Sequence, residues 1–140
     1  LLYDVRSAPG MAERVNNSPP RLLTPSRHVV ENHFDAVVCY LRTAIRAANW
    51  VQDNPVEARD LIARECSIDA DKIETYLEPD YRDKFLPQLD GDLVEALEVV
   101  KSFLHEHRFI DQDFPVKDWI EPGPLTQAYQ LEGLTTSPSH

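Results

Sequence analysis

The sequence predicts a mainly α chain with one or two short strands. Two observations support this class: apolar residues recur at three- and four-residue spacing over two long stretches, and a proline-led restart signal separates two helices. A chain of 140 residues suffices for one domain with a modest core, which we expect to span 1–140. Within it we expect an extended entry segment at 1–20, a helical portion at 21–121 and a tail at 122–140.

The entry segment offers turns and no periodic apolar face, because it contains Pro9, Gly10 and the pair Pro19-Pro20. Leu22 and Leu23 follow as the strand candidate. Pro25 would stop this strand, since proline has no N–H for a sheet ladder.

The first helix is predicted from Asn32 to about Asp53 on one apolar face. The residues of that face are Phe34, Val37, Val38, Leu41, Ala44, Ile45 and Ala48. Asn54, Pro55 and Glu57 then predict a helix restart: an amide cap, a proline at the first helical position and a carboxylate at the third.

The second helix is expected to end near Ser67 and to turn four side chains inward. These are Ala58, Leu61, Ile62 and Cys66. Asp69 is the expected cap of a third helix, and Ile68 and Ile73 have the spacing of a hydrophobic staple.

A last long helix is predicted from a capping pair at Asp92 and Glu95. Its apolar face comprises Leu93, Ala96, Leu97, Val100, Phe103, Leu104 and His107. The flanking loops are expected to supply buried anchors at Phe85, Leu86, Leu89, Trp119 and Ile120, a helix start at Pro115, and a Pro-Gly-Pro turn at 122–124.

The charge argues against nucleic acid as a partner. With 24 acidic and 14 basic side chains the net charge is -10, which removes the phosphate attraction behind such binding. We also expect no metal site, because His28 and His33 are five residues apart and do not stack on one helix face. No cofactor motif is present, and with four glycines a phosphate-binding loop is hard to build.

A catalytic nucleophile is not expected either. Cys39 and Cys66 are predicted to be buried thiols on helix faces. Cys39 has no histidine at helical contact spacing, and Cys66 lies near the C-terminal end of its helix, where the helix dipole disfavours a thiolate. His105 and His107 point to different sides of one helix, with one expected to be partly buried beside Phe103. The sequence therefore favours a protein without an active site of its own.

One long pattern resembles a known family. The run "SRHVVENHFDAVVCYLRTAIRAANWVQDNPVEARDLIARE" is similar to the C-terminal helical part of solute-binding proteins of sulfonate, nitrate and taurine ABC importers. The matching places are Arg27 to Val30, Phe34 to Arg46, Trp50, Asn54-Pro55 and Glu57-Ala58. In the later run "FLPQLDGDLVEALEVVKSFLHEHRFIDQDFPVKDWIEP", the Leu-Pro-x-Leu-Asp, Phe-Leu and Pro-Val-x-x-Trp elements look most like the aryl-sulfinate desulfinase branch. Together the matching runs span about residues 20–121.

The resemblance implies the C-terminal portion of a two-lobed α/β fold of the periplasmic-binding-protein-like II type. A small anionic solute would lie between the lobes of the full-length parent, which would dock on an ABC permease. Arg21 and Thr24, at the end of the predicted strand, are the candidate ligand-binding residues, since strand ends face the crevice in such sheets. The parent would be extracytoplasmic as a solute-binding protein and cytoplasmic as a desulfinase.

Two alternatives stay open beside this prediction. The chain could belong to a desulfinase-like enzyme that cleaves C–S bonds, although neither cysteine matches the catalytic one of that branch. It could instead be a free-standing helical interaction domain that shares only helix-corner patterns with the importers. If the chain is truncated, uncovered apolar surface favours a homodimer.

Overall fold

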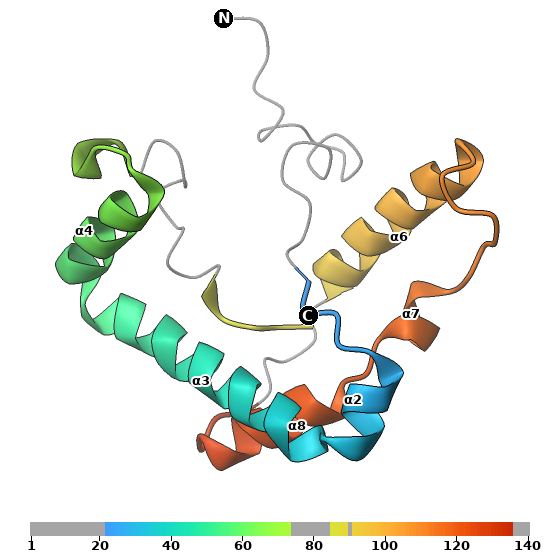
Figure 1. Cartoon of the computed structure of the whole chain (residues 1–140), viewed down its shortest axis with the longest axis horizontal. Coiled ribbons are helices and arrows are strands. Elements are labelled where there is room, and N and C mark those ends of the chain that lie inside the picture. Colours follow the sequence, from blue (N-terminus) through green and yellow to red (C-terminus); the bar gives the residue numbers. More distant parts are fainter. Residues whose placement is uncertain (1–21, 74–84, 90, 136–140) are drawn as a thin grey trace, which may run out of the picture. The chain divides into compact units, whose positions relative to one another are not determined.

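The secondary structure of the described residues is helical. The computed structural model describes residues 22–73, 85–89 and 91–135 (Figure 1). In these ranges the elements are α2 (Arg27–Asn32), α3 (Phe34–Asp53), α4 (Pro55–Cys66), the 3-10 helix η2 (Ala70–Lys72), α6 (Gly91–Glu106), α7 (Val116–Trp119) and α8 (Gly123–Leu131). No strand occurs within the described ranges, and the predicted mainly α class is confirmed.

The strand predicted at Leu22 and Leu23 is wrong. Residues 22 to 26 have no regular secondary structure, and both leucines are about half exposed. A two-residue strand needs a partner for its backbone hydrogen bonds, and none is present in the described part of the chain. After Pro25 the chain instead enters α2, a short helix that the sequence pattern did not predict.

The contacts between residues divide the chain into two units, which are described separately. One contains Leu89–Gly123 together with the segment before Arg27, and the other contains Arg27–Gln88 and Pro124–Thr136.

Helix α3 forms the centre of the core of the second unit. It turns Val37, Val38, Leu41, Ile45 and Ala48 inward, as the periodicity predicted. The first four of these pack with Ala128 and Tyr129 of α8, and the partly buried Val29, Phe34, Leu86 and Leu125 surround them. The Tyr129 hydroxyl donates a 2.8 Å hydrogen bond to the Pro87 carbonyl, which ties the 85–88 segment to α8.

The corner between α3 and α4 lies where the restart signal predicted it, but Asn54 has a different role. Its side-chain and backbone N–H groups both donate to the Trp50 carbonyl, each at 2.9 Å, and no side-chain bond caps α4. Asn54 therefore satisfies the C-terminal end of α3, where carbonyls lack helical partners. Pro55 begins α4 at a position where its missing N–H has no cost.

The inward face of α4 is rotated from the predicted one. Ala58 and Ala63 are buried, whereas Leu61 and Cys66 are exposed. Ala63 and Ile73 form a second apolar cluster, against which Ile62, Ile68 and Ala70 pack. The predicted staple residues Ile68 and Ile73 both take part in this cluster. Because the cluster packs on the Ala63 side of α4, that side is buried and Leu61 stays exposed.

Three helices end in the same left-handed turn. Within the described residues, positive φ occurs at Ser67 (57°) after α4, Arg108 (60°) after α6 and Gly133 (69°) after α8. In each turn the next N–H reaches the carbonyl five residues back: Ile68 to Ala63, Phe109 to Leu104 and Leu134 to Tyr129. These are Schellman motifs, which satisfy terminal carbonyls, and only one of the three uses glycine.

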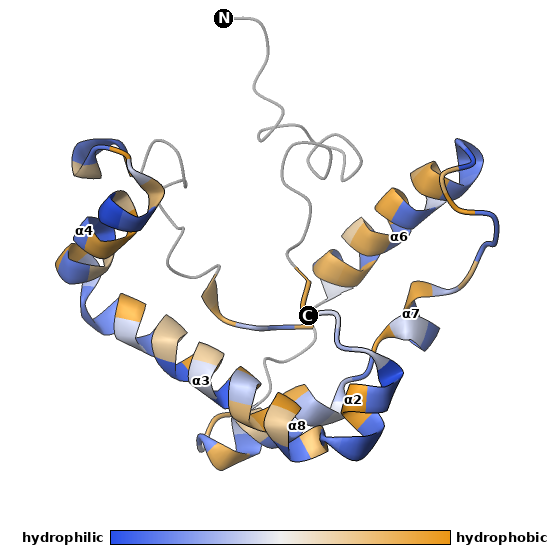
Figure 2. Cartoon of the chain, viewed as in Figure 1, coloured by the Kyte–Doolittle hydropathy of each residue, from blue (hydrophilic) through white to orange (hydrophobic). Residues whose placement is uncertain are grey.

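The other unit is built on α6, which begins one residue before the predicted Asp92. Apolar residues recur along its length (Figure 2), yet only Ala96 is fully buried and Phe103 and His107 are exposed. Val116 of α7 is buried close to α6, while Trp119, the predicted anchor, is 53% exposed. Phe85 and Leu89 are also exposed, and the other two predicted loop anchors, Leu86 and Ile120, are partly buried.

The Pro-Gly-Pro turn predicted at 122–124 is instead the start of α8. Proline is tolerated in the first helical turn, where its missing N–H would have no partner. The Glu121 carboxylate accepts a 3.0 Å hydrogen bond from the Gly123 N–H and so serves as a cap. The predicted tail at 122–140 therefore contains a helix, whose apolar stripe is short and comprises Leu125, Ala128 and Tyr129.

Candidate functional site

The described part of the chain contains one of the two candidate ligand-binding residues. Arg21 lies outside the described residues. Thr24 is exposed on the irregular segment before α2, where no strand end exists. Its role as a solute contact stays a prediction.

His28 of α2 and His33, which follows α2, lie close together. The rings of His28 and His33 meet edge to face, with centroids 6.1 Å apart. The Asn32 side chain approaches the His28 Nδ1 at 3.1 Å and donates to the His28 carbonyl at 3.0 Å. Across the residues with assigned positions, no group of three or more His, Cys, Asp or Glu side chains could hold a metal ion.

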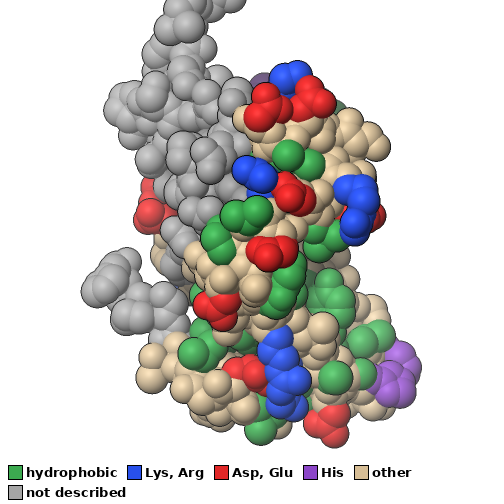
Figure 3. Space-filling model, turned by 90° about the vertical axis from the view of Figure 1, so that its left-hand side faces the viewer, with side chains coloured by type: hydrophobic (Ala, Val, Ile, Leu, Met, Phe, Trp, Pro, Cys, Tyr) green, Lys and Arg blue, Asp and Glu red, His purple; other side chains and the backbone are tan. Residues whose placement is uncertain are grey.

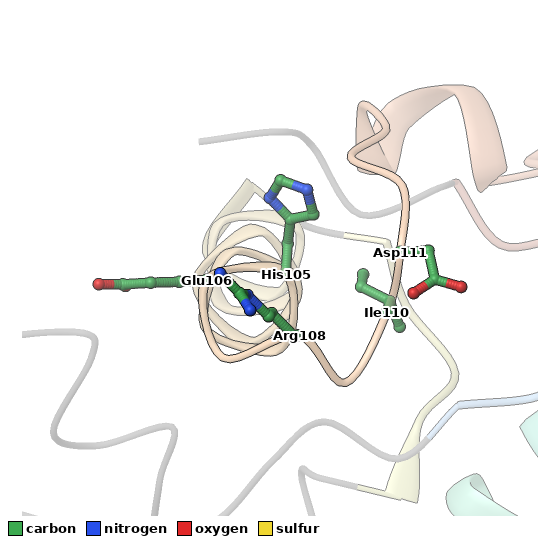
Figure 4. Close-up of a pocket in the computed structure, with 5 residues that line it drawn as sticks. All are labelled: His105, Glu106, Arg108, Ile110 and Asp111. Atoms are coloured by element: carbon green, nitrogen blue, oxygen red, sulfur yellow. The ribbon is translucent and has the colours of Figure 1, made fainter.

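A shallow hollow lies at the C-terminal end of α6, lined by His105, Glu106, Arg108, Ile110 and Asp111 (Figure 4). The polar side chains do not converge: Glu106 points away from the loop that carries Ile110 and Asp111. The expectation of a partly buried histidine here is wrong, since His105 and His107 are both exposed. His107 lies against the exposed ring of Phe103, with centroids 4.3 Å apart. This hollow lacks the convergent groups of a ligand site.

An arginine pair on α3 holds the end of α8. Arg42 Nε and Arg46 Nε donate to the two carboxylate oxygens of Glu132, at 2.7 Å and 2.8 Å. The Glu132 side chain is only 13% exposed. Hydrogen bonds from Arg46 and Arg42 lower the pKa of Glu132, and the bond to Glu132 raises the pKa of Arg46. One carboxylate between two guanidiniums is a structural clamp, which the sequence pattern did not reveal because the partners are 86 and 90 residues apart.

A second charged cluster connects the loop after α6 back to that helix. Glu98 accepts a 2.7 Å hydrogen bond from the Val116 N–H, and Lys101 donates to Asp113 at 2.7 Å and lies 3.0 Å from Glu98. The Val116 N–H and then Lys101 lower the pKa of Glu98, and Lys101 lowers the pKa of Asp113. Glu98 thereby supplies the cap that α7 lacks locally.

Helix α3 has a second, uncharged surface opposite its core face. This outer face comprises Ala36, Tyr40, Thr43, Ala47 and Trp50, which recur at helical spacing over four turns. Tyr40 is 60% exposed and Trp50 is 42% exposed. Hydrophobic side chains also reach the surface between charged ones in the view of Figure 3. A helix that is apolar on two opposite sides is typical of one that lies between two layers.

The two thiols are on the surface, contrary to the prediction. Cys39 lies next to Val38 on α3 but points outward, and Cys66 is the last residue of α4. No helix in residues 22–73, 85–89 and 91–135 has both the length and the apolar character needed to cross a membrane.

Comparison with known proteins adds no identity to these observations: no family model, curated protein or solved structure matches the chain.

Proposed function

We propose that this chain is the C-terminal helical part of an ABC-importer substrate-binding protein for a small anionic solute such as a sulfonate, nitrate or taurine. The observation that carries the proposal is the helix corner at Asn54-Pro55. The corner joins α3, which carries Trp50, to α4, which has Glu57 and Ala58 in its first turn. These residues occupy the positions that resemble the importer pattern. The proposed role of this corner is to brace one lobe of the binding protein.

The outer face of α3 supports the same proposal. In a two-lobed α/β protein, helices cover sheets, and a helix with two apolar sides fits between a sheet and a second helical layer. Under the proposal, Tyr40 and Trp50 contact parts of the parent protein other than the described residues. The core face of α3 meanwhile packs on α8, as described above.

The proposed chemistry of recognition belongs to the cleft of the parent. Helix N-termini and polar side chains there would satisfy the anionic head group. The proposal assigns Arg42 and Arg46 a structural role, because the Nε of each already donates to Glu132. This chain would contribute support to the site, with Arg21 and Thr24 as its proposed contacts.

The test is isothermal titration calorimetry on the full-length parent with taurine, methanesulfonate and nitrate. We expect saturable heat for one of these anions and none for choline, a cation of similar size. Absence of heat for all three anions would contradict the proposed function. Arg21→Ala in the parent then tests the contact residue, with Arg64→Ala as the control on the exposed surface of α4.

A desulfinase-like parent is the second candidate, and the tail motifs favour it. Leu86-Pro87-x-Leu89 precedes α6, Phe103-Leu104 lies within α6, and Pro115-Val116-x-x-Trp119 forms the start and body of α7. Release of sulfite from an aryl sulfinate by the parent would establish this activity. A parent without a cysteine facing its cleft would exclude it.

A free-standing helical interaction domain is the third candidate, and the lack of strands in the described residues favours it. Such a domain would fold with its apolar surface covered, whereas the outer face of α3 is uncovered by any described residue. The upstream coding sequence separates the two readings: a preceding α/β region supports the importer part, and its absence supports the free-standing domain.

We also propose that the 140-residue chain alone forms a homodimer through its uncovered apolar surface. Light scattering should give about twice the mass of one chain at high concentration. Tyr40→Glu should shift the mass toward the monomer, whereas Glu65→Gln, an exposed residue of α4 that is not part of the outer face of α3, should not. A monodisperse wild-type monomer would contradict the dimer.

A further inference from the structure

We draw no further inference here: the strongest candidate, the outer face of α3 around Tyr40 and Trp50, is already assigned to the rest of the parent by the proposed function, and nothing in the described part of the chain shows what else covers it.

Discussion

Ile45 is the residue on which the core around α3 most depends. Its side chain is 0% exposed and lies among Leu41, Ala128 and Tyr129. We expect Ile45→Ala to reduce the free energy of unfolding by about 2–5 kcal/mol, since it removes buried methyl groups and leaves a cavity. Urea unfolding followed by circular dichroism measures this loss.

The matched control for Ile45→Ala lies on the opposite side of the same helix. Thr43→Ala changes a residue of the exposed outer face and should alter the unfolding free energy by less than about 0.5 kcal/mol. A larger loss for Thr43→Ala than for Ile45→Ala would mean that the inward face of α3 has been assigned to the wrong side.

The clamp at Glu132 should make stability depend on pH in the acid range. Because Arg46 and Arg42 hold the folded-state pKa of Glu132 below its ordinary value of 4.5, the unfolded carboxylate binds its proton first as the pH falls. The contribution of Glu132 is therefore present above pH 4.5 and is lost as the pH drops through the lowered pKa. Glu132→Gln should lower the melting temperature at pH 7 and leave it close to that of the wild type at strongly acid pH.

Glu65→Gln serves as the control for that comparison, since Glu65 is exposed and pairs with its neighbour Arg64, at 3.3 Å. Exposed pairs of this kind contribute little to stability. A pH-independent difference between Glu132→Gln and the wild type would show that the carboxylate acts through its shape and not through its charge.

Residue types predicted burial less well than they predicted helices. Cys39 and Cys66 are usually buried residue types, yet both are exposed here, because burial requires a neighbouring element that covers the position. Asn54 caps a helix as expected from its residue type, but its side chain donates to the Trp50 carbonyl at the end of the preceding helix. The direction of a side chain at a corner depends on backbone angles that the pattern does not contain.

At the scale of elements, the left-handed helix ends offer a direct test of backbone cost. Ser67 adopts φ 57° at the end of α4, a conformation that strains residues with a Cβ. Removing this strain should stabilise the folded protein by about 1–2 kcal/mol, and the greater freedom of glycine in the unfolded chain offsets part of that gain. We therefore expect Ser67→Gly to raise the free energy of unfolding by about 0.5–1 kcal/mol.

The reverse substitution at Gly133 is the control. Apart from Gly133 itself and its two chain neighbours, no residue has a heavy atom within 4 Å of the position that a Cβ would take there, so Gly133→Ala tests the backbone conformation at φ +69°. It should destabilise the protein by about 1 kcal/mol. A destabilising Ser67→Gly would show instead that the serine side chain supports the turn.

The long helices and the start of α7 after Pro115 were predictable from the sequence, whereas α2 and α8 were not. The periodic faces of α3 and α6 extend over several turns, and the Asn-Pro restart marks the start of α4. Helices α2 and α8 have few apolar residues to form a pattern, and α8 begins among prolines that resemble a turn. Leu22 and Leu23 resembled a strand only because nothing local to two residues reveals whether a partner strand exists.

At the scale of the whole molecule, the proposed function predicts two different costs for one substitution. In the isolated chain, measured at a concentration where it is monomeric, Tyr40→Ala should change stability by less than about 0.5 kcal/mol, because the ring is 60% exposed. In the parent, where the outer face of α3 is proposed to be covered, the same change should cost about 3–5 kcal/mol, the range for large buried aromatic side chains. Equal small effects in both proteins would contradict the proposed cover.

The side-chain clusters of the molecule could not be predicted from the sequence, because they depend on contacts between distant segments. Hydrogen-bonded clusters such as Arg42, Arg46 and Glu132 join residues far apart in sequence, so no spacing reveals them. The proposed contacts Arg21 and Thr24 depended on a strand that is not present in the described residues. The mainly α class was predictable because it depends on local periodicity alone.

The exposure of both tryptophans determines what fluorescence can report. The chain has two, Trp50 on α3 and Trp119 on α7, and they are 42% and 53% exposed. Their emission should already resemble that of indole in water when the protein is folded, so it will change little on denaturation. A shift of the emission maximum to shorter wavelength would instead signal that another molecule or segment has excluded solvent from one of these indoles.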